Sequence, residues 1–134
     1  MTDETTYTLH RHAEHLAVVK LAVGADVPAW AGSSSLLSIS ATASETSIVC
    51  AAAGVPTKAR PQGPFTAFEV AGPLDFALTG VLAALLGPLA DEEISVFTIS
   101  TFDTDWILVP AEAADRAAAA WRRRGHDVVP ATPR

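Results

Sequence analysis

The stretch STFDTDW, from Ser100 to Trp106, places two carboxylates and three hydroxyl groups between two apolar runs, ISVFTI and WILV. Side chains of this kind serve four purposes in proteins: a metal cradle, a catalytic pair of aspartates, a hairpin turn or a ligand-binding loop. A calcium loop of the EF-hand type needs further oxygen ligands at alternate positions, a glycine and a distal glutamate. Here Trp106, Ile107 and Leu108 follow the aspartates, so the calcium interpretation fails.

A phosphatase with an apolar strand ending in Asp-x-Asp is the second chemical option. The run before Asp103 ends in ISTF and is not apolar, and no later acidic metal-binding motif follows it. The sequence also has no Gly-rich phosphate loop, no Ser-His-Asp set and no activated lysine. We therefore predict no enzyme activity, no catalytic residues and no cofactor. A hairpin turn at Asp103 and Thr104 stays open, because both residues tolerate turn geometry.

The histidines of LHRHAEH and the single cysteine are the other candidates for chemistry. His10 and His12 would share one face of an extended strand, but no cysteine or carboxylate completes a zinc ligand set. Cys50 stands among small apolar residues and cannot form an internal disulfide. We expect no metal site, and we interpret Cys50 as a packing residue.

Composition limits the class of protein further. The 134 residues are 49% hydrophobic and 18% charged, which fits one compact domain or two very small fused ones. The net charge of −6 argues against nucleic acid and anionic lipid as partners. The start MTDETTYTLHRH lacks the pattern of a signal peptide, and no apolar run is long enough to span a membrane. A cytoplasmic protein is expected.

From residue 65 onward, the sequence pattern predicts a clear order of strands and helices. PFTAFEVAG predicts a strand, and DFALTGVLAALLGPLA predicts a helix with Asp75 as N-cap and a stop at Gly87 and Pro88. EISVFTIS and DWILV predict a hairpin, AEAADRAAAAWRRRG a second helix with its arginines in the last turn, and HDVVP a final strand. This β-α-β-β-α-β order predicts an α+β, ferredoxin-like fold: a four-stranded antiparallel sheet with two helices on one face.

The N-terminal half resembles an incomplete copy of the same plan. HLAVVKLA predicts a strand, DVPAWA one helical turn, and LLSISATASETSIVC two strands around a polar turn. Thr42 and Ile48 match Thr101 and Ile107 at an offset of about 59 residues. The segment AAAGVPTKARPQGP, rich in proline and glycine, stands where a second helix would belong.

The predicted crossover brings two loops to one edge of the sheet. The strand before the first helix and the first hairpin strand run parallel, so GPLDFALTG and STFDTD should lie side by side. A helix start offers unpaired N–H groups to a carboxylate, and Asp103 and Asp105 could hold an ammonium group. This arrangement suits a zwitterion. Glycine inside a helix is destabilising, so the expected helical position of Gly80 needs an explanation. Either close packing or a close approach of the ligand can provide it.

The segment from Ala71 to Val109, with GPLDFALTGVLA and then ISVFTISTFDTDWILV, resembles the ACT-domain family. It is similar to the group that contains small bacterial tandem-ACT proteins and the eukaryotic cytosolic arginine sensor, and also to the regulatory modules of aspartate kinases. The kinase portion itself is absent. The resemblance implies a regulatory fold without catalysis, in which modules pair and amino acids bind at the seam.

Residue by residue, the resemblance implies a ligand site at two segments. Backbone contacts would come from Thr79, Gly80 and Val81. The hairpin would contribute Thr101, Phe102 and Asp105, with Asp105 facing a cationic group; Asp75, Asp103 and Thr104 are further candidates.

We therefore expect a degenerate ACT-like module over residues 1–62 and a complete one over residues 63–134. The expected function is that of an amino-acid-binding sensor that acts as a homodimer. The alternative is a module of the same fold that has lost its ligand and serves protein interaction or dimerisation.

Overall fold

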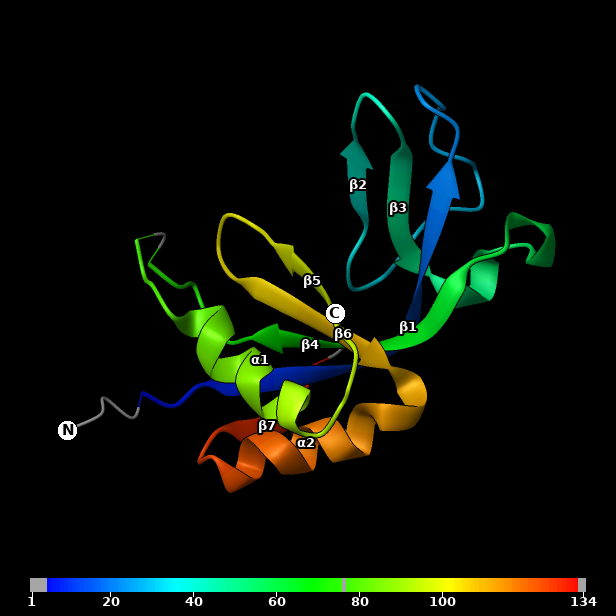
Figure 1. Ribbon diagram of the computed structural model, residues 1–134. Helices are drawn as coiled ribbons and strands as arrows, with labels where there is room; N and C mark the ends of the chain where they lie inside the picture. Colours follow the sequence, from blue (N-terminus) through cyan, green and yellow to red (C-terminus); the bar gives the residue numbers. More distant parts are fainter. Residues whose placement is uncertain (1–4, 76, 133–134) are drawn as a thin grey trace. The chain divides into compact units, whose positions relative to one another are not determined.

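The computed structural model describes residues 5–75 and 77–132, and the chain forms two compact units over them (Figure 1). Residues 5–13 and 66–132 make the C-terminal unit, and residues 14–65 make the N-terminal unit. Strands β1 (Thr8–Leu21) and β4 (Gln62–Val70) run from one unit into the other. The boundaries therefore differ from the expected division between residues 62 and 63, because a strand from the start of the chain belongs with the C-terminal half.

The C-terminal unit has a sheet with two helices against it. After β4 the elements are α1 (Val81–Asp91), β5 (Phe97–Ser100), β6 (Asp105–Pro110), η3 (Ala111–Ala113), α2 (Ala114–Arg123) and β7 (Asp127–Pro130). In the sheet, β1 lies between β7 and β4, and β6 and β5 follow β4. Strands β5 and β6 are antiparallel, with Ser100 opposite Asp105, as expected of the hairpin.

Strand β1 changes the sheet from the expected four-stranded plan. Its residues Thr8 to Arg11 pair in parallel with Asp127 to Pro130 of β7. On its other side, the Ala71 N–H donates to the Thr8 carbonyl at 2.8 Å, at the end of β4. The expectation of a purely antiparallel four-stranded sheet was wrong because β1 takes the place beside β4 that the final strand would otherwise have.

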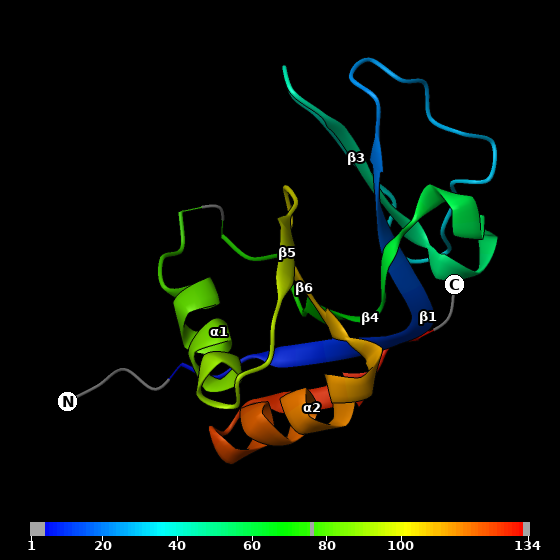
Figure 2. The same cartoon turned by 45° about the vertical axis from the view of Figure 1, so that its right-hand side comes forward.

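Both helices cover the same face of this sheet (Figure 2). The core there joins side chains of all the layers: Leu9, Phe68, Val70, Ile107 and Val109 from strands, and Val81, Leu85, Leu89, Ala117 and Trp121 from helices. Trp121 is fully buried, and its ring meets Phe68 edge-on with centroids 4.9 Å apart. Its indole N–H donates to the Leu85 carbonyl at 2.8 Å and so ties α2 to α1.

Helix α1 begins and ends later than the sequence predicted. Asp75 does not cap it: the Asp75 carboxylate accepts the Ala77 N–H at 2.9 Å in a separate turn, and the helix starts at Val81. Its last turn continues through Gly87 and Pro88 to Asp91. Proline removes one intrahelical hydrogen bond, but burial of Pro88 and Leu89 holds this turn on the core.

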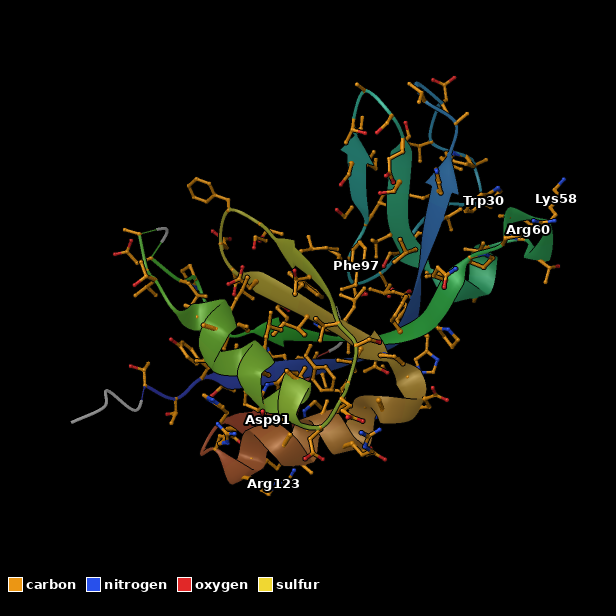
Figure 3. The ribbon with its side chains drawn as sticks, viewed as in Figure 1. Trp30, Lys58, Arg60, Asp91, Phe97 and Arg123 are labelled. Carbon is orange, nitrogen blue, oxygen red and sulfur yellow. The ribbon has the colours of Figure 1, made fainter. Side chains whose placement is uncertain are left out.

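The arginines of WRRRG lie at the end of α2, where the negative end of the helix dipole favours cations. Arg124 pairs with Asp91 at 2.8 Å, and Arg123 lies 3.7 Å from Glu92 (Figure 3 labels Asp91 and Arg123). Gly125, with φ of 88°, ends the helix in the left-handed conformation expected there. These exposed pairs join the C-terminal ends of the two helices.

The N-terminal unit contains β2 (Ser38–Ala41) and β3 (Thr46–Ala51), with β1 beside β3. The 3-10 turns η1 (Ala52–Gly54) and η2 (Thr57–Ala59) stand where the prolines excluded a second helix. In place of the expected helical turn, DVPAWA has a single hydrogen-bonded turn, in which the Ala31 N–H donates to the Pro28 carbonyl at 3.0 Å. Trp30 instead packs on a small core of Val19, Ile48 and Cys50.

The β2–β3 and β5–β6 hairpins share one register. At the offset of 59 residues, the pair Ser38 and Val49 corresponds to Phe97 and Leu108. Their turns also correspond: the Thr42 N–H donates to the Glu45 carbonyl, and the Thr101 N–H to the Thr104 carbonyl, both at 2.8 Å. The hairpin part of the expected repeat is thus present in the structure.

Glu14 and a run of three serines close the loop that follows β1. The Glu14 carboxylate accepts hydrogen bonds from the hydroxyls of Ser33, Ser34 and Ser35 and from two backbone N–H groups. Burial raises the pKa of Glu14, but these hydrogen bonds outweigh it and lower the pKa from 4.5 to about 2. The charged carboxylate therefore stabilises this loop.

This lowered pKa predicts an acid-sensitive N-terminal unit. The stabilisation by Glu14 should be complete above pH 4.5 and should be lost as the pH falls toward 2, since the unfolded chain takes up the proton first. Urea unfolding of the wild-type chain and Glu14→Gln at pH 7 and pH 3 measures this. The difference in free energy of unfolding between the wild-type chain and Glu14→Gln should be smaller at pH 3 than at pH 7. An equal difference at pH 7 and pH 3 would contradict the prediction. Glu45→Gln serves as the control variant.

No helix in the described part of the chain is long and apolar enough to cross a membrane.

Candidate functional site

A cavity of about 310 Å³ opens in the C-terminal unit between the start of α1 and the tip of the β5–β6 hairpin. Two segments line it. The first is the stretch that leads into α1 and its first turn, with Leu74, Asp75, Leu78, Gly80, Val81 and Leu82. The second is the hairpin, with Ser100, Thr101, Phe102, Asp103, Thr104 and Asp105.

The α1 side of the cavity is shaped by Gly80. This residue precedes the helix, with φ of 81° and ψ of 0°, and its carbonyl accepts the first helical hydrogen bond, from Ala84, at 2.9 Å. Among the described residues, no side chain caps the first turn. The N–H groups of Val81, Leu82 and Ala83 come at the positive end of the helix dipole, where a carboxylate is stabilised. The sequence had predicted Gly80 inside the helix, whereas the structure places it directly before the helix.

The hairpin side is a rigid turn. The Thr101 hydroxyl donates to the Thr104 carbonyl at 3.0 Å, beside the backbone bond between the same residues. The buried Thr104 hydroxyl donates to the Val70 carbonyl of β4 at 2.6 Å. The Leu74 N–H donates to the Asp103 carbonyl at 2.7 Å. These bonds fix the hairpin against β4 and against the loop that carries Asp75.

Asp105 begins β6 and is half-buried at the cavity wall. Its Oδ1 accepts a hydrogen bond from the Ser100 hydroxyl at 2.6 Å across the hairpin. Within the described residues no other hydrogen bond or ion pair reaches this carboxylate. A charged and positioned acceptor therefore faces the cavity opposite the start of α1.

The structure places eight of the nine sequence candidates on the cavity wall. These are Gly80, Val81, Thr101, Phe102 and Asp105, with Asp75, Asp103 and Thr104 from the second group. Thr79 is exposed and does not line the cavity, although Leu78 beside it does.

Sequence reasoning missed the remaining lining residues. Ser100 bonds Asp105 across the hairpin, and the STFDTDW motif contained it, but only the strand register makes the two neighbours. Leu74, Leu78 and Leu82 supply an aliphatic wall. No role at the site was predicted for these leucines.

Gly80→Ala tests the geometry of the helix start. A Cβ at this position meets no atom within 4 Å, so space does not oppose it, whereas the φ of 81° does. We expect the free energy of unfolding to fall by about 1–2 kcal/mol, the cost of a left-handed conformation for an L-residue. Thermal or urea unfolding measures this. Gly87→Ala, where a Cβ also meets nothing and φ is helical, should cause no loss; equal losses at both positions would contradict the prediction.

Within residues 5–75 and 77–132, no three His, Cys, Asp or Glu side chains gather as a metal ion requires. His12 stacks on Trp106 with ring centroids 4.8 Å apart, and its Nε2 lies 3.0 Å from Glu69. Cys50 is buried, and burial raises the pKa of its thiol.

Comparison with known proteins finds two family models that match parts of the chain. Residues 62–123 match the family model of the ACT domain, and residues 14–58 match the model of a separate N-terminal domain family. The ACT-domain match includes the segment from Ala71 to Val109 in which the sequence resembles that family, so this resemblance is confirmed. No curated protein matches it significantly.

Several solved structures are similar to the whole chain. A protein from Agobacterium tumefaciens is 29% identical, with a TM-score of 0.86 over 96% of both chains. A Vibrio cholerae protein of unknown function, described as a possible transport protein, is 19% identical, with a TM-score of 0.68 over 89% of this chain and 90% of its own. The Clostridium acetobutylicum aspartate kinase, described as an allosteric enzyme, is 9% identical, with a TM-score of 0.62 over 87% of this chain and 34% of its own. The two matches below a quarter identity show the shared fold alone.

Proposed function

We propose that this chain is a regulatory protein that binds an α-amino acid in the cavity between α1 and the β5–β6 hairpin, and that it performs no catalysis. One observation carries the proposal: an uncapped helix start and a positioned aspartate face the same cavity. The ACT-domain match over residues 62–123 supports a regulatory role.

The two ends of the cavity complement the two charges of an amino acid. The α-carboxylate would accept hydrogen bonds from the N–H groups at Val81 and Leu82, where the helix dipole contributes about 0.3–1 kcal/mol. The ammonium group would donate to Asp105, and a hydrogen bond to a charged group contributes about 1.5–3 kcal/mol. Ser100 would hold the Asp105 carboxylate in place for this contact.

We further propose that the N-terminal unit and the C-terminal unit are two ACT-like modules, the first of them degenerate, and that each chain has one ligand site. The matching registers of the two hairpins support the repeat. In the N-terminal unit the residue that corresponds to Asp105 is the uncharged Thr46, and a segment with turns but no helix stands in place of α1. The charged acceptor and the helix start are thus both missing there.

A cytoplasmic homodimer remains part of the proposal. Leu78 and Phe102 line the cavity with 52% and 84% of their surface exposed, so an apolar surface is available for a second copy of the chain. Light scattering with and without ligand tests this.

Isothermal calorimetry of the full chain against the proteinogenic amino acids tests the function. We expect binding of at least one amino acid with one ligand per chain, together with a higher melting temperature. The proposal would be wrong if no amino acid gave a heat of binding and the melting temperature stayed unchanged. The alternative of a ligand-free interaction module would then be favoured.

A further inference from the structure

His126 is a buried histidine that holds the residues just before β1 and the first residue of that strand. Its ring Nδ1 accepts the Tyr7 N–H at 3.0 Å, and the two rings stack with centroids 5.7 Å apart. The Tyr7 carbonyl in turn accepts the N–H of Asp127, the residue after His126, at 2.9 Å. We call these three interactions the His126–Tyr7 contact.

This contact requires an uncharged imidazole ring. A ring nitrogen that accepts a hydrogen bond carries no proton, so the proton of the neutral ring is on Nε2. In the charged form both nitrogens carry a proton, and the N–H at Nδ1 would face the N–H of Tyr7. Protonation of His126 therefore replaces the hydrogen bond by two opposed donors.

The groups around the ring favour its neutral form. From α2, Arg124 repels a positive ring, while Arg122 bonds a backbone carbonyl. From β1 the uncharged phenol of Tyr7 faces the ring, and Asp127 of β7 is exposed. No carboxylate among the described residues forms an ion pair with His126. Burial, and then the charge of Arg124, lower the pKa of His126 from 6.5. The stabilisation by the neutral ring is thus complete above pH 6.5 and is lost as the pH falls below this value.

The start of β1 also holds the loop that leads to the cavity. The Thr8 carbonyl, next to Tyr7, accepts the Ala71 N–H at 2.8 Å. Three residues after Ala71, Leu74 lines the cavity, and its N–H donates to a carbonyl of the β5–β6 hairpin turn. A hydrogen bond from the start of β1 therefore fixes the first residue of a loop whose last residue belongs to the cavity wall.

We propose that the His126–Tyr7 contact is a pH-sensitive switch: when the ring takes up a proton, Tyr7 and Thr8 detach from β7, and the loop of residues 71–74 is held less firmly. The cavity then binds its ligand more weakly in mild acid than at neutral pH. The switch is a property of the chain without ligand, whereas its effect on affinity rests on the proposed function.

Hydrogen exchange of the full chain without ligand tests the switch, while NMR follows the protonation of His126 from about pH 8 to about pH 5. After correction for the intrinsic rate at each pH, we expect the Tyr7 and Ala71 amides to exchange about tenfold faster in the protonated form. The Ile94 amide, which donates to the Leu89 carbonyl after α1, should keep its protection. Equal protection of Tyr7 and Ala71 in both forms would overturn the proposal. A ring that stays neutral over the whole range would overturn it as well.

Two arginine variants show whether His126 is the group that titrates. Arg124→Gln removes an exposed charge that opposes protonation, so the midpoints of ring titration and of amide exchange should move together to higher pH. Arg123→Gln is the matched control, because Arg123 lies beside Glu92 and should leave both midpoints nearly unchanged. If the midpoint of exchange stays fixed while that of the ring moves, His126 is not the switch.

Calorimetry at pH 7.5 and pH 5 tests the effect on the cavity, with the tightest ligand of the amino-acid panel. The wild-type chain should bind several-fold more weakly at pH 5. His126→Asn keeps an acceptor for the Tyr7 N–H but does not titrate, so its affinity should be the same at both pH values. Equal affinity of the wild-type chain at both values would overturn the coupling between the switch and the cavity. Binding of no amino acid at either pH would contradict the proposed function, and the exchange experiment would still decide the switch.

Discussion

Asp105→Asn should weaken amino-acid binding about ten- to a hundredfold. The change removes the negative charge that faces the ligand's ammonium group, and a hydrogen bond to a charged group contributes about 1.5–3 kcal/mol, with tenfold in affinity for each 1.4 kcal/mol. The asparagine oxygen can still accept the hydrogen bond from Ser100, so the hairpin should keep its shape. Calorimetry with the tightest ligand of the amino-acid panel measures the loss.

Asp115→Asn is the matched control for this variant. Asp115 is an exposed aspartate on α2, paired with Arg11 and outside the cavity. Its replacement should leave the affinity unchanged. If Asp105→Asn binds the ligand as tightly as the control does, Asp105 is not the acceptor for the ammonium group.

Trp121→Ala should lower the free energy of unfolding by about 3–5 kcal/mol. Trp121 is fully buried between α1 and the sheet, and its removal leaves a cavity beside Phe68. A loss of this size is a large fraction of the 5–15 kcal/mol that stabilises a typical domain. Urea unfolding followed by circular dichroism measures it.

Trp121→Phe separates packing from hydrogen bonding at this position. Phenylalanine keeps an aromatic ring against Phe68 but loses the N–H that donates to the Leu85 carbonyl. We expect a smaller loss than for alanine, with about 0.5–1.5 kcal/mol of it from the hydrogen bond. A loss below 1 kcal/mol for Trp121→Ala would show that Trp121 does not hold the core together.

Local patterns in the sequence predicted the elements of the C-terminal half well. The β-rich runs around STFDTD predicted the β5–β6 hairpin, and the alanine-rich segment with Gly125 predicted α2 and its end. These features depend on residues close together in the chain. The boundaries of α1 were wrong because they depend on tertiary packing, which keeps Pro88 inside the helix, and on a turn that Asp75 caps by itself.

The cavity could be predicted in outline. Crossover topology alone brought the start of the first helix and the hairpin together, and that is where the structure has the cavity. The exact set of residues that line the cavity could be found only from the three-dimensional structure. Thr79 lies outside the wall although Leu78 and Gly80 on either side of it line the cavity, and the pairing of β5 with β6 brings Ser100 to Asp105. Periodicity in the sequence encodes neither the position of Thr79 nor the contact between Ser100 and Asp105.

Strand β1 has a practical consequence for experiments on fragments. A fragment of residues 63–134 contains nearly all of the ACT match, but it lacks Leu9, which is fully buried in the core of the C-terminal unit, and the strand that pairs with β7. We expect such a fragment to expose a gap in its sheet and to fold poorly, in spite of its domain-like sequence. A peptide of residues 5–13 supplied in trans would fill that gap. The C-terminal unit of this protein is therefore assembled from two separate stretches of the chain.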